Sequence, residues 1–208
     1  MRTQTPELVL FDYGGVLAEE GYKIAMADLA LANGKNPEEL KRIAFDLAYA
    51  TGFNTGKIRE NEFWGIFRKA SGIEADDAFL TAFVLKRFIL RPFMISLVKN
   101  LKKKGIQTAI LSDQTHWLDE LNKRDDFFGY FDSVFNSFHE GITKKESLYF
   151  EKAIKSSGKT PDKILFVDDH APHIERARAL GMDAILYVEE NEFRAEMGKR
   201  FPFDPFTG

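Results

Sequence analysis

The sequence has 208 residues, of which 44% are hydrophobic, with a formal net charge of -3 at pH 7 and no cysteine. This length allows one sizeable core, or a core with a small inserted module. The weak net charge gives no general attraction to nucleic acid or anionic membranes, so neither is expected as a partner. The lack of cysteine excludes disulfides, cysteine-based zinc sites and thiol catalysis.

The N-terminus shows no targeting signal. Met1 to Glu7 lead directly into an apolar segment, without the hydrophobic region of a signal peptide. No apolar run reaches the ~18 residues that a membrane helix requires. The sequence therefore predicts a cytoplasmic protein.

The first predicted element is a buried strand that ends at a carboxylate. Leu8 to Phe11 are all apolar, and Asp12 is followed by Tyr13 and two glycines. Such continuous apolar runs are typical of parallel sheets, whose ligands bind beyond the carboxyl ends of the strands. Asp12 is therefore a candidate functional residue, and the alternative is an Asp that only opens a turn.

The next stretch, from about residue 19 to 90, has the apolar spacing of helices rather than of strands. Breaks at Gly34, Pro37 and Gly72 separate these helices. Asp12 and Ser112 lie 100 positions apart, far more than a single crossover between neighbouring strands requires. We therefore predict a helical cap over 19–90, inserted into a core formed by 1–18 and 91–208.

After this insertion, strands and helices alternate as a doubly wound sheet requires. A helix is predicted from Phe93 to Lys104, followed by a strand from Gly105 to Leu111 that ends at Ser112 and Asp113. A hydroxyl with free backbone N–H groups at a strand end suits an anionic oxygen. The alternative is an ordinary helix N-cap or turn residue.

Two lysines and two aspartates follow further along the chain. Lys144 and Lys145 precede a helix predicted over 146–157, and on their own they indicate a solvated surface. The next strand ends at the adjacent carboxylates of Asp168 and Asp169, which repel one another unless a cation lies against them. Mg²⁺ held by these two acids and Asp12 would meet this need. Removing either acid is expected to relieve the repulsion in the metal-free protein.

The order of these elements, from about Glu7 to Val188, resembles the haloacid dehalogenase superfamily. The resemblance implies an α/β fold, with a doubly wound, Rossmann-like parallel sheet core and a small inserted α-helical cap. It implies that Asp12 is a nucleophile that forms an aspartyl-phosphate, and that Ser112, Asp113 and Lys144 bind the substrate, with Ser112 and Lys144 in contact with its phosphate. It also implies a Mg²⁺ site formed by Asp12, the carbonyl of Gly14, Asp168 and Asp169, in which Asp169 is a direct ligand and Asp168 holds a metal-bound water.

Three positions depart from the family's pattern. Gly14 stands where phosphatases of the superfamily carry a second Asp as general acid and base, and the candidate replacements are His170, Glu19 and Glu20. Asp113 replaces a common Asn and adds a negative charge near the phosphate. Lys145 replaces the usual Pro, which leaves open whether Lys144 or Lys145 faces the site, although Lys144 is favoured.

The resemblance implies a Mg²⁺-dependent phosphatase whose partner is a small phosphorylated metabolite. The alternatives are a metal-independent 2-haloacid dehalogenase, or a protein that kept the fold with weak or lost turnover and acts in binding or regulation. Among the cap residues, Arg59 and Arg68 are candidate substrate contacts, whereas Trp64 is expected in the cap core. The aromatic segment from Phe201 to Phe206 is expected to pack on the chain's own surface, with a homodimer contact as the alternative.

Overall fold

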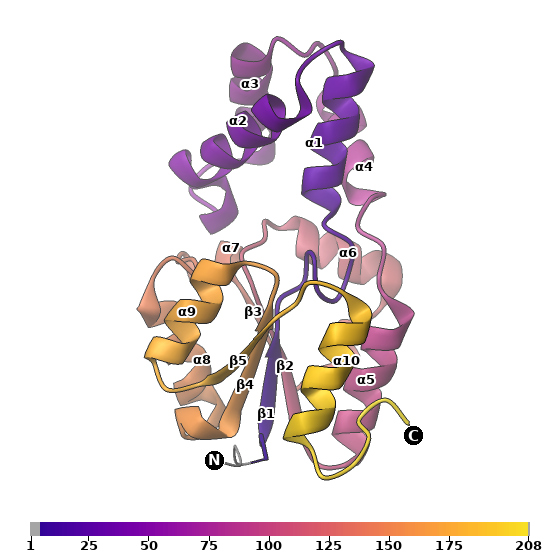
Figure 1. The fold of residues 1–208 in the computed structure, drawn as a ribbon. Coiled ribbons are helices and arrows are strands. Elements are labelled where there is room, and N and C mark those ends of the chain that lie inside the picture. The colour runs from indigo at the N-terminus through magenta and orange to yellow at the C-terminus, as the bar shows by residue number, and fades with distance from the viewer. Residues whose placement is uncertain (1–4, 208) are drawn as a thin grey trace.

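The computed structural model describes residues 5–207 and contains a five-stranded parallel sheet with helices on both faces (Figure 1). The strand order is β3-β2-β1-β4-β5, so the first strand lies at the centre. This arrangement confirms the predicted doubly wound α/β fold. The strands are β1 Leu8–Phe11, β2 Gln107–Ser112, β3 Ser133–Asn136, β4 Ile164–Asp168 and β5 Asp183–Leu186.

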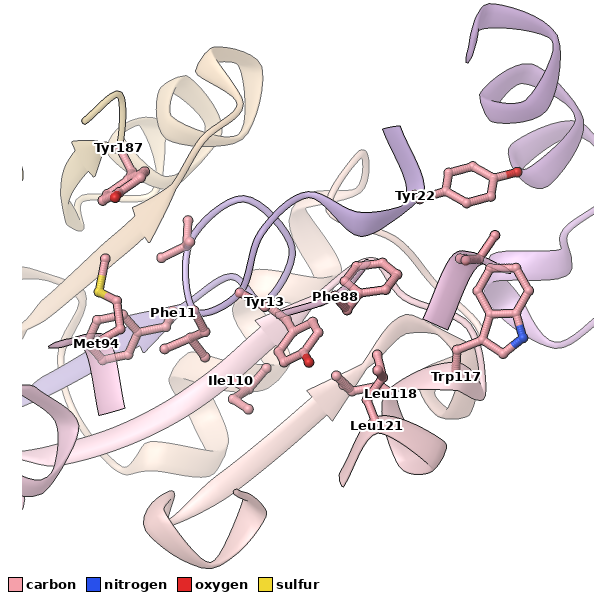
Figure 2. Packing of buried hydrophobic residues seen from close by; sticks show 14 of the residues in the cluster. Phe11, Tyr13, Tyr22, Phe88, Met94, Ile110, Trp117, Leu118, Leu121 and Tyr187 are labelled. Carbon is pink, nitrogen blue, oxygen red and sulfur yellow. The ribbon is translucent and has the colours of Figure 1, made fainter. Parts of the chain in front are cut away.

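Both faces of the central strand are buried, which explains its continuous apolar sequence. Val9 and Phe11 belong to one apolar cluster that includes residues of α5 and α10, whereas Leu8 and Leu10 belong to a second cluster with residues of α8 and α9 (Figures 1 and 2). The helices that accompany the sheet are α5 Pro92–Lys103, α6 Trp117–Asp125, α7 Ser137–Glu140, α8 Ser147–Ser157, α9 Ala171–Ala179 and α10 Glu190–Arg200.

Four helices lie above the carboxyl ends of the strands (Figure 1): α1 Gly21–Ala32, α2 Pro37–Ala50, α3 Glu60–Ser71 and α4 Asp77–Leu85. Local sequence explains their ends. Asn36 caps α2 by accepting a hydrogen bond from the Glu39 N–H, with Pro37 in the first turn, and α3 stops at Gly72 in the left-handed conformation. The helical content of this stretch agrees with the sequence, and its action as a cap stays a prediction.

The chain enters and leaves this helical segment at neighbouring positions. Ala18 pairs with Leu90 in an antiparallel bridge, and the Arg91 N–H donates to the carbonyl of Leu17 at 2.9 Å. In the rest of the chain, single helices or helix pairs connect consecutive strands, and short turns η2 Phe128–Tyr130 and η3 Pro161–Lys163 lie directly before β3 and β4. The insertion therefore leaves the order of the sheet undisturbed.

Glu60, at the start of α3, joins the upper helices to α6. Its carboxylate accepts hydrogen bonds from Trp117 Nε1 at 2.7 Å and from Thr81 Oγ1, and it lies 3.3 Å from His116 Nε2. Partial burial would raise the pKa of Glu60, but hydrogen bonds from His116, Thr81 and Trp117 outweigh it and lower the pKa to about 2. The ionised Glu60 carboxylate therefore links the upper helices α3 and α4 to α6.

We expect Glu60→Gln to lower the free energy of unfolding at pH 7 by roughly 2 kcal/mol, because it removes charge-assisted hydrogen bonds. A depressed folded pKa contributes stability that is fully present above the ordinary value of 4.5 and is lost as the pH falls toward about 2. Urea unfolding at pH 7 and pH 3 should thus show a smaller difference between variant and parent at pH 3. The exposed Glu74→Gln is the matched control, and an equal effect of both variants would contradict this role.

The aromatic C-terminal segment packs on the chain itself, as expected. Phe201 is buried, and Phe203 and Phe206 pack against the same apolar cluster as β1. Phe206 also meets Phe193 of α10 edge to face, with the Arg194 guanidinium 4.3 Å from its ring centre. Within residues 5–207, no helix combines the length and apolar character needed to cross a membrane.

Candidate active site

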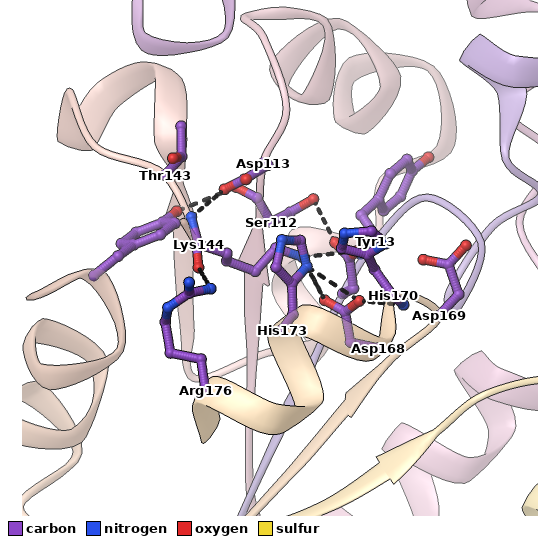
Figure 3. A network of polar contacts seen from close by, with 12 residues as sticks. Tyr13, Ser112, Asp113, Thr143, Lys144, Asp168, Asp169, His170, His173 and Arg176 are labelled. Carbon is purple, nitrogen blue, oxygen red and sulfur yellow. Dashed lines mark hydrogen bonds and ion pairs between the residues drawn. The ribbon is translucent and has the colours of Figure 1, made fainter. Parts of the chain in front are cut away.

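The register of the sheet brings together the polar residues that the sequence places at the ends of β1, β2 and β4. Phe11 pairs with Ile110 of β2 and with Val167 of β4, so the residues that follow these strands meet at one edge. Ser112 Oγ donates a hydrogen bond to Asp12 Oδ1 at 2.8 Å, and the Tyr13 N–H donates to the same oxygen at 2.7 Å (Figure 3). Asp12 is buried, and this pairing fixes the orientation of its carboxylate.

Lys144 lies between two of the carboxylates. Its Nζ atom is 2.8 Å from Asp12 Oδ2 and 2.6 Å from Asp168 Oδ2, and the residue is fully buried. Burial alone would lower the pKa of Lys144, but Asp12 and Asp168 raise it well above its ordinary value. The side chain is therefore a permanent cation at the strand ends.

The structure shows which lysine faces Asp12. Lys144 is positioned through its backbone, because its N–H donates to Asp113 Oδ1 at 2.8 Å and its carbonyl accepts from Arg176 Nη1 at 2.7 Å (Figure 3). The amine of Lys145 instead lies 3.5 Å from the ring centre of Tyr49. Lys144, as favoured, contacts the acids, and Lys145 stacks on the aromatic ring.

The added charge of Asp113 is accommodated by donors. One carboxylate oxygen accepts from the Lys144 N–H, and the other accepts from the Tyr49 hydroxyl at 3.0 Å. The Asp113 carboxylate therefore joins the backbone of Lys144 to the Tyr49 side chain of α2. Its role in substrate binding stays a prediction.

Three carboxylates lie close enough to share one metal ion. Asp12, Asp168 and Asp169 each offer an oxygen, and these oxygens lie within 4.8 Å of one another. Gly15, with φ of 82°, makes room for this arrangement, because a Cβ at that position would lie 2.4 Å from Asp169 Oδ2. Burial raises the pKa of Asp12 well above its ordinary value, Lys144 opposes this rise, and the negative charges of Asp168 and Asp169 add to it. An all-oxygen set with excess negative charge fits a hard divalent cation.

Asp168 has hydrogen-bonding partners that the sequence did not predict. His173, in the first turns of α9, places Nδ1 3.2 Å from Asp168 Oδ2, and the His170 N–H donates to Asp168 Oδ1 at 2.7 Å. Burial would raise the pKa of Asp168, but Lys144 and His173 outweigh it and lower the pKa. Sequence reasoning missed His173, although its place at the helix start after a strand-end acid was an available signal.

The three candidates for the missing proton carrier occupy different surroundings. A Cβ placed on Gly14 would lie 3.1 Å from Glu20 Oε2, so the Glu20 carboxylate fills the space into which an Asp side chain at position 14 would extend. Glu19 is turned away and pairs with Arg91 at 3.2 Å. The ring of His170 packs edge to face on His173, with centres 4.6 Å apart. Burial raises the pKa of Glu20 to about 7, although 23% of its side chain is exposed.

A cavity of about 840 Å³ opens between these acids and the upper helices. Its lining includes Asp12, Ser112 and Lys144, aromatic residues of α1, α2 and α6, and the charged side chains of Asp46 and Lys145. The suggested substrate contacts Arg59 and Arg68 are not among the lining residues, and Arg68 instead pairs with Asp77 at 2.6 Å. Trp64 is fully buried, as expected for a core residue.

A family model for haloacid dehalogenase-like hydrolases matches residues 6–181. The chain belongs to this family of hydrolases. A drimenol cyclase of Aspergillus calidoustus is 27% identical to the hydrolase over 157 residues, which cover 72% of this chain and 29% of the cyclase. The hydrolase thus spans less than a third of the length of that relative. A sesquiterpene phosphatase of Aspergillus oryzae is 26% identical over 190 residues, covering 86% of this chain and 88% of the phosphatase.

The fold of the hydrolase is also that of solved members of the family. A family enzyme from Bacteroides thetaiotaomicron, solved in complex with magnesium and inorganic phosphate, superimposes with a TM-score of 0.68 at 20% identity. The match covers 86% of this chain and 93% of that enzyme. At this identity the likeness establishes the fold of the hydrolase.

Proposed function

We propose that this hydrolase is a Mg²⁺-dependent phosphatase that acts on a small phosphorylated metabolite through an aspartyl-phosphate on Asp12. The observation that carries the proposal is the setting of Asp12, which faces the Lys144 ammonium at 2.8 Å and the Ser112 hydroxyl at 2.8 Å beside two further carboxylates. A cation and a hydroxyl donor around a nucleophilic carboxylate suit a phosphoryl group, whose transfer depends on positioning and charge stabilisation.

The relatives support the same assignment. One sequence relative is a sesquiterpene phosphatase that aligns over most of both chains, and one structural relative binds magnesium and inorganic phosphate. The three clustered carboxylates disfavour a metal-independent dehalogenase, because such a set is costly to bury without a cation. Mg²⁺ held by Asp12, Asp168, Asp169 and the Gly14 carbonyl would neutralise phosphate charge when bound.

In the first proposed step, a carboxylate oxygen of Asp12 attacks phosphorus. A bond forms between Asp12 and phosphorus while the bond from phosphorus to the ester oxygen breaks, and the leaving alkoxide takes a proton. Lys144 and Ser112 hold the non-bridging oxygens of the phosphoryl group. In the second step, water attacks phosphorus and gives up a proton while the bond from phosphorus to the Asp12 oxygen breaks, so that the Asp12 carboxylate is restored and inorganic phosphate is released.

Glu20 is the residue that we assign to this proton transfer. Its carboxylate lies where a side chain on Gly14 would project, whereas Glu19 is paired with Arg91 and the His170 ring packs on His173. Glu20 also lines the cavity together with Asp12. A protonated Glu20 would give its proton to the leaving oxygen and recover one from the attacking water, as a general acid and then a base.

The test is phosphate release from p-nitrophenyl phosphate and a panel of phosphorylated metabolites, measured with EDTA and with added Mg²⁺. We expect turnover only with Mg²⁺. Turnover of 2-chloropropionate in EDTA would favour the dehalogenase, and the absence of any turnover under both conditions would favour a binding or regulatory protein.

The two adjacent acids should respond differently to substitution. Asp169→Ala is expected to weaken Mg²⁺ binding about 10- to 100-fold while leaving the metal-free melting temperature unchanged or higher, because it removes a repelling carboxylate. Asp168→Ala should instead lower the metal-free melting temperature, since it leaves Lys144 and His173 without their shared partner. We therefore expect relief of repulsion on removal of Asp169 alone, and not on removal of either acid.

Thermal melts of both variants with EDTA and with Mg²⁺, together with calorimetric Mg²⁺ titrations, measure these effects. Lys23→Gln is the matched control, because its side chain is 46% exposed and its amine lies 3.4 Å from Asp169 Oδ2. Equal metal-free melting temperatures for Asp168→Ala and Asp169→Ala would show that Asp168 has no special supporting role.

A further inference from the structure

Four lysine and arginine side chains line the cavity, and they differ in whether a carboxylate lies against them. Lys23 and Lys144 each have a carboxylate partner, at 3.4 and 2.8 Å respectively. Lys145 and Arg176 line the same cavity, but neither forms an ion pair with an Asp or Glu within residues 5–207. Positive charge without a counter-charge on the wall of a cavity attracts an anion.

The amine of Lys145 is positioned by an aromatic ring. Its Nζ atom lies 3.5 Å from the ring centre of Tyr49, which attracts a cation through its π electrons. Within residues 5–207, no oxygen or nitrogen accepts a hydrogen bond from this amine, and an ammonium has three donors to offer. Lys145 is exposed as well as lining the cavity, so a ligand can reach it.

The guanidinium of Arg176 reaches the same cavity from α9. Its Nη1 atom donates to the Lys144 carbonyl at 2.7 Å, which is the one hydrogen bond of this side chain within residues 5–207 (Figure 3). A guanidinium has five N–H donors, so most of them are available to a ligand. Lys144 contacts Arg176 through its carbonyl and Asp12 through its amine, so the lysine side chain separates Arg176 from the proposed phosphate position.

The acids of the cavity do not neutralise Lys145 and Arg176, because they have other partners. Asp169 and Glu20 lie 3.4 and 3.8 Å from the Lys23 amine. Both oxygens of Asp113 accept hydrogen bonds from an N–H or a hydroxyl. The exposed Asp46 carboxylate lies 3.6 Å from an arginine one turn earlier on α2.

Building on the proposed phosphatase activity, we propose that the substrate is a phosphate monoester with a second anionic group, a carboxylate or a phosphate, that binds Lys145 and Arg176. Lysine and arginine side chains bind both anions through charge-assisted hydrogen bonds. The phosphate to be transferred lies at Asp12 and Lys144. Because the Lys144 side chain separates the two places, the second group is carried on the carbon skeleton of the substrate. The cavity of about 840 Å³ has room for such a molecule.

The first test compares kcat/KM at saturating Mg²⁺ and low salt for butyl, pentyl and hexyl phosphates whose far end is a methyl, an ammonium, a carboxylate or a second phosphate. At the best chain length, we expect one of the two anions to raise kcat/KM about tenfold or more over the methyl, and the ammonium to lower it. The larger increase identifies the anion. If neither anion exceeds the methyl at any length, or if the ammonium gives the best substrate, the inference is overturned.

A second test needs no turnover. Calorimetric titrations with Mg²⁺ present compare butyl-, pentyl- and hexylphosphonate with the same phosphonates carrying a terminal carboxylate or a second phosphonate. We expect one terminal anion to tighten binding about tenfold or more. Equal affinity across the series, or no binding of any member, would overturn the inference. If p-nitrophenyl phosphate is not hydrolysed, the proposed function fails, and the phosphonate titrations still decide whether a second anion is bound.

Lys145→Gln removes the charge of one proposed contact. It is the variant of choice because Arg176 also holds the backbone of Lys144. We expect the ratio of kcat/KM for the best dianionic substrate to that for its methyl counterpart to fall about tenfold, mainly through a higher KM for the dianionic substrate. A thermal melt must show that the variant is folded. An unchanged ratio in the folded variant would overturn the assignment of Lys145.

Lys155→Gln is the matched control. Lys155 is an exposed lysine of α8 that does not line the cavity, and its substitution changes the net charge by the same amount. We expect this variant to keep the parent's ratio within about twofold, because exposed charges beyond about 10 Å are largely screened at moderate salt. An equal fall in both variants would show a general effect of net charge and would overturn the proposed contact.

Discussion

Asp12→Asn should reduce phosphate release by at least about 10³-fold, because an amide keeps the shape of the side chain but cannot attack phosphorus. The fold should persist, since Ser112 Oγ and the Tyr13 N–H can still donate to the amide oxygen and Lys144 keeps its contact with Asp168. Initial rates on p-nitrophenyl phosphate at saturating Mg²⁺ measure the loss.

Circular dichroism and a thermal melt on the same sample must show that the Asp12→Asn protein is folded. Intact-mass analysis should exclude deamidation, which would restore the parent residue. Residual turnover within tenfold of the parent, in a folded and undeamidated sample, would contradict the assignment of Asp12 as the nucleophile.

Glu20→Gln should slow hydrolysis of alkyl phosphates by roughly 10²- to 10⁴-fold, which is the usual contribution of a general acid or base. With p-nitrophenyl phosphate the first step needs no proton, so the variant should release about one equivalent of p-nitrophenolate per site rapidly. The following steady state should be slow, because the attacking water lacks its base. Stopped-flow absorbance measures this burst.

Glu19→Gln and His170→Gln are the controls for this experiment, since both residues were candidates for the same role. Neither should show a burst, and both should keep the parent's ratio of alkyl to aryl ester turnover. If Glu20→Gln lacks a burst and retains alkyl phosphate turnover within threefold, Glu20 is not the proton carrier. A burst in the His170 variant instead would transfer the role to that imidazole.

The strand-end acids were predictable because two local signals agreed. Continuous apolar runs before Asp12 and Asp168 indicate buried parallel strands, and carboxylates at such ends are costly unless they serve a site. The same reasoning placed Ser112 on a neighbouring strand. Parallel pairing then brings these residues together whatever the intervening chain does, so the fold and the centre of the site followed from the sequence.

The remaining choices depended on contacts that are distant in the sequence. Glu19 and Glu20 are chemically similar neighbours, and Arg91, far along the chain, holds the first away from the cavity. Lys144 and Lys145 differ in direction because Asp113 and Arg176 hold the backbone of the first. No periodicity distinguishes such adjacent residues in a loop, so their orientation required the structure.

The bridge between Ala18 and Leu90 has an architectural consequence. Because the Leu17 carbonyl and the Arg91 N–H are hydrogen-bonded at 2.9 Å, the two ends of the insertion are already joined in space, and a brief turn could replace the intervening residues. The segment can therefore be exchanged for another of different length without rethreading the sheet. Such an exchange would also remove Glu20, which lies within the segment, so a replacement would have to carry a proton carrier of its own for the proposed reaction to continue.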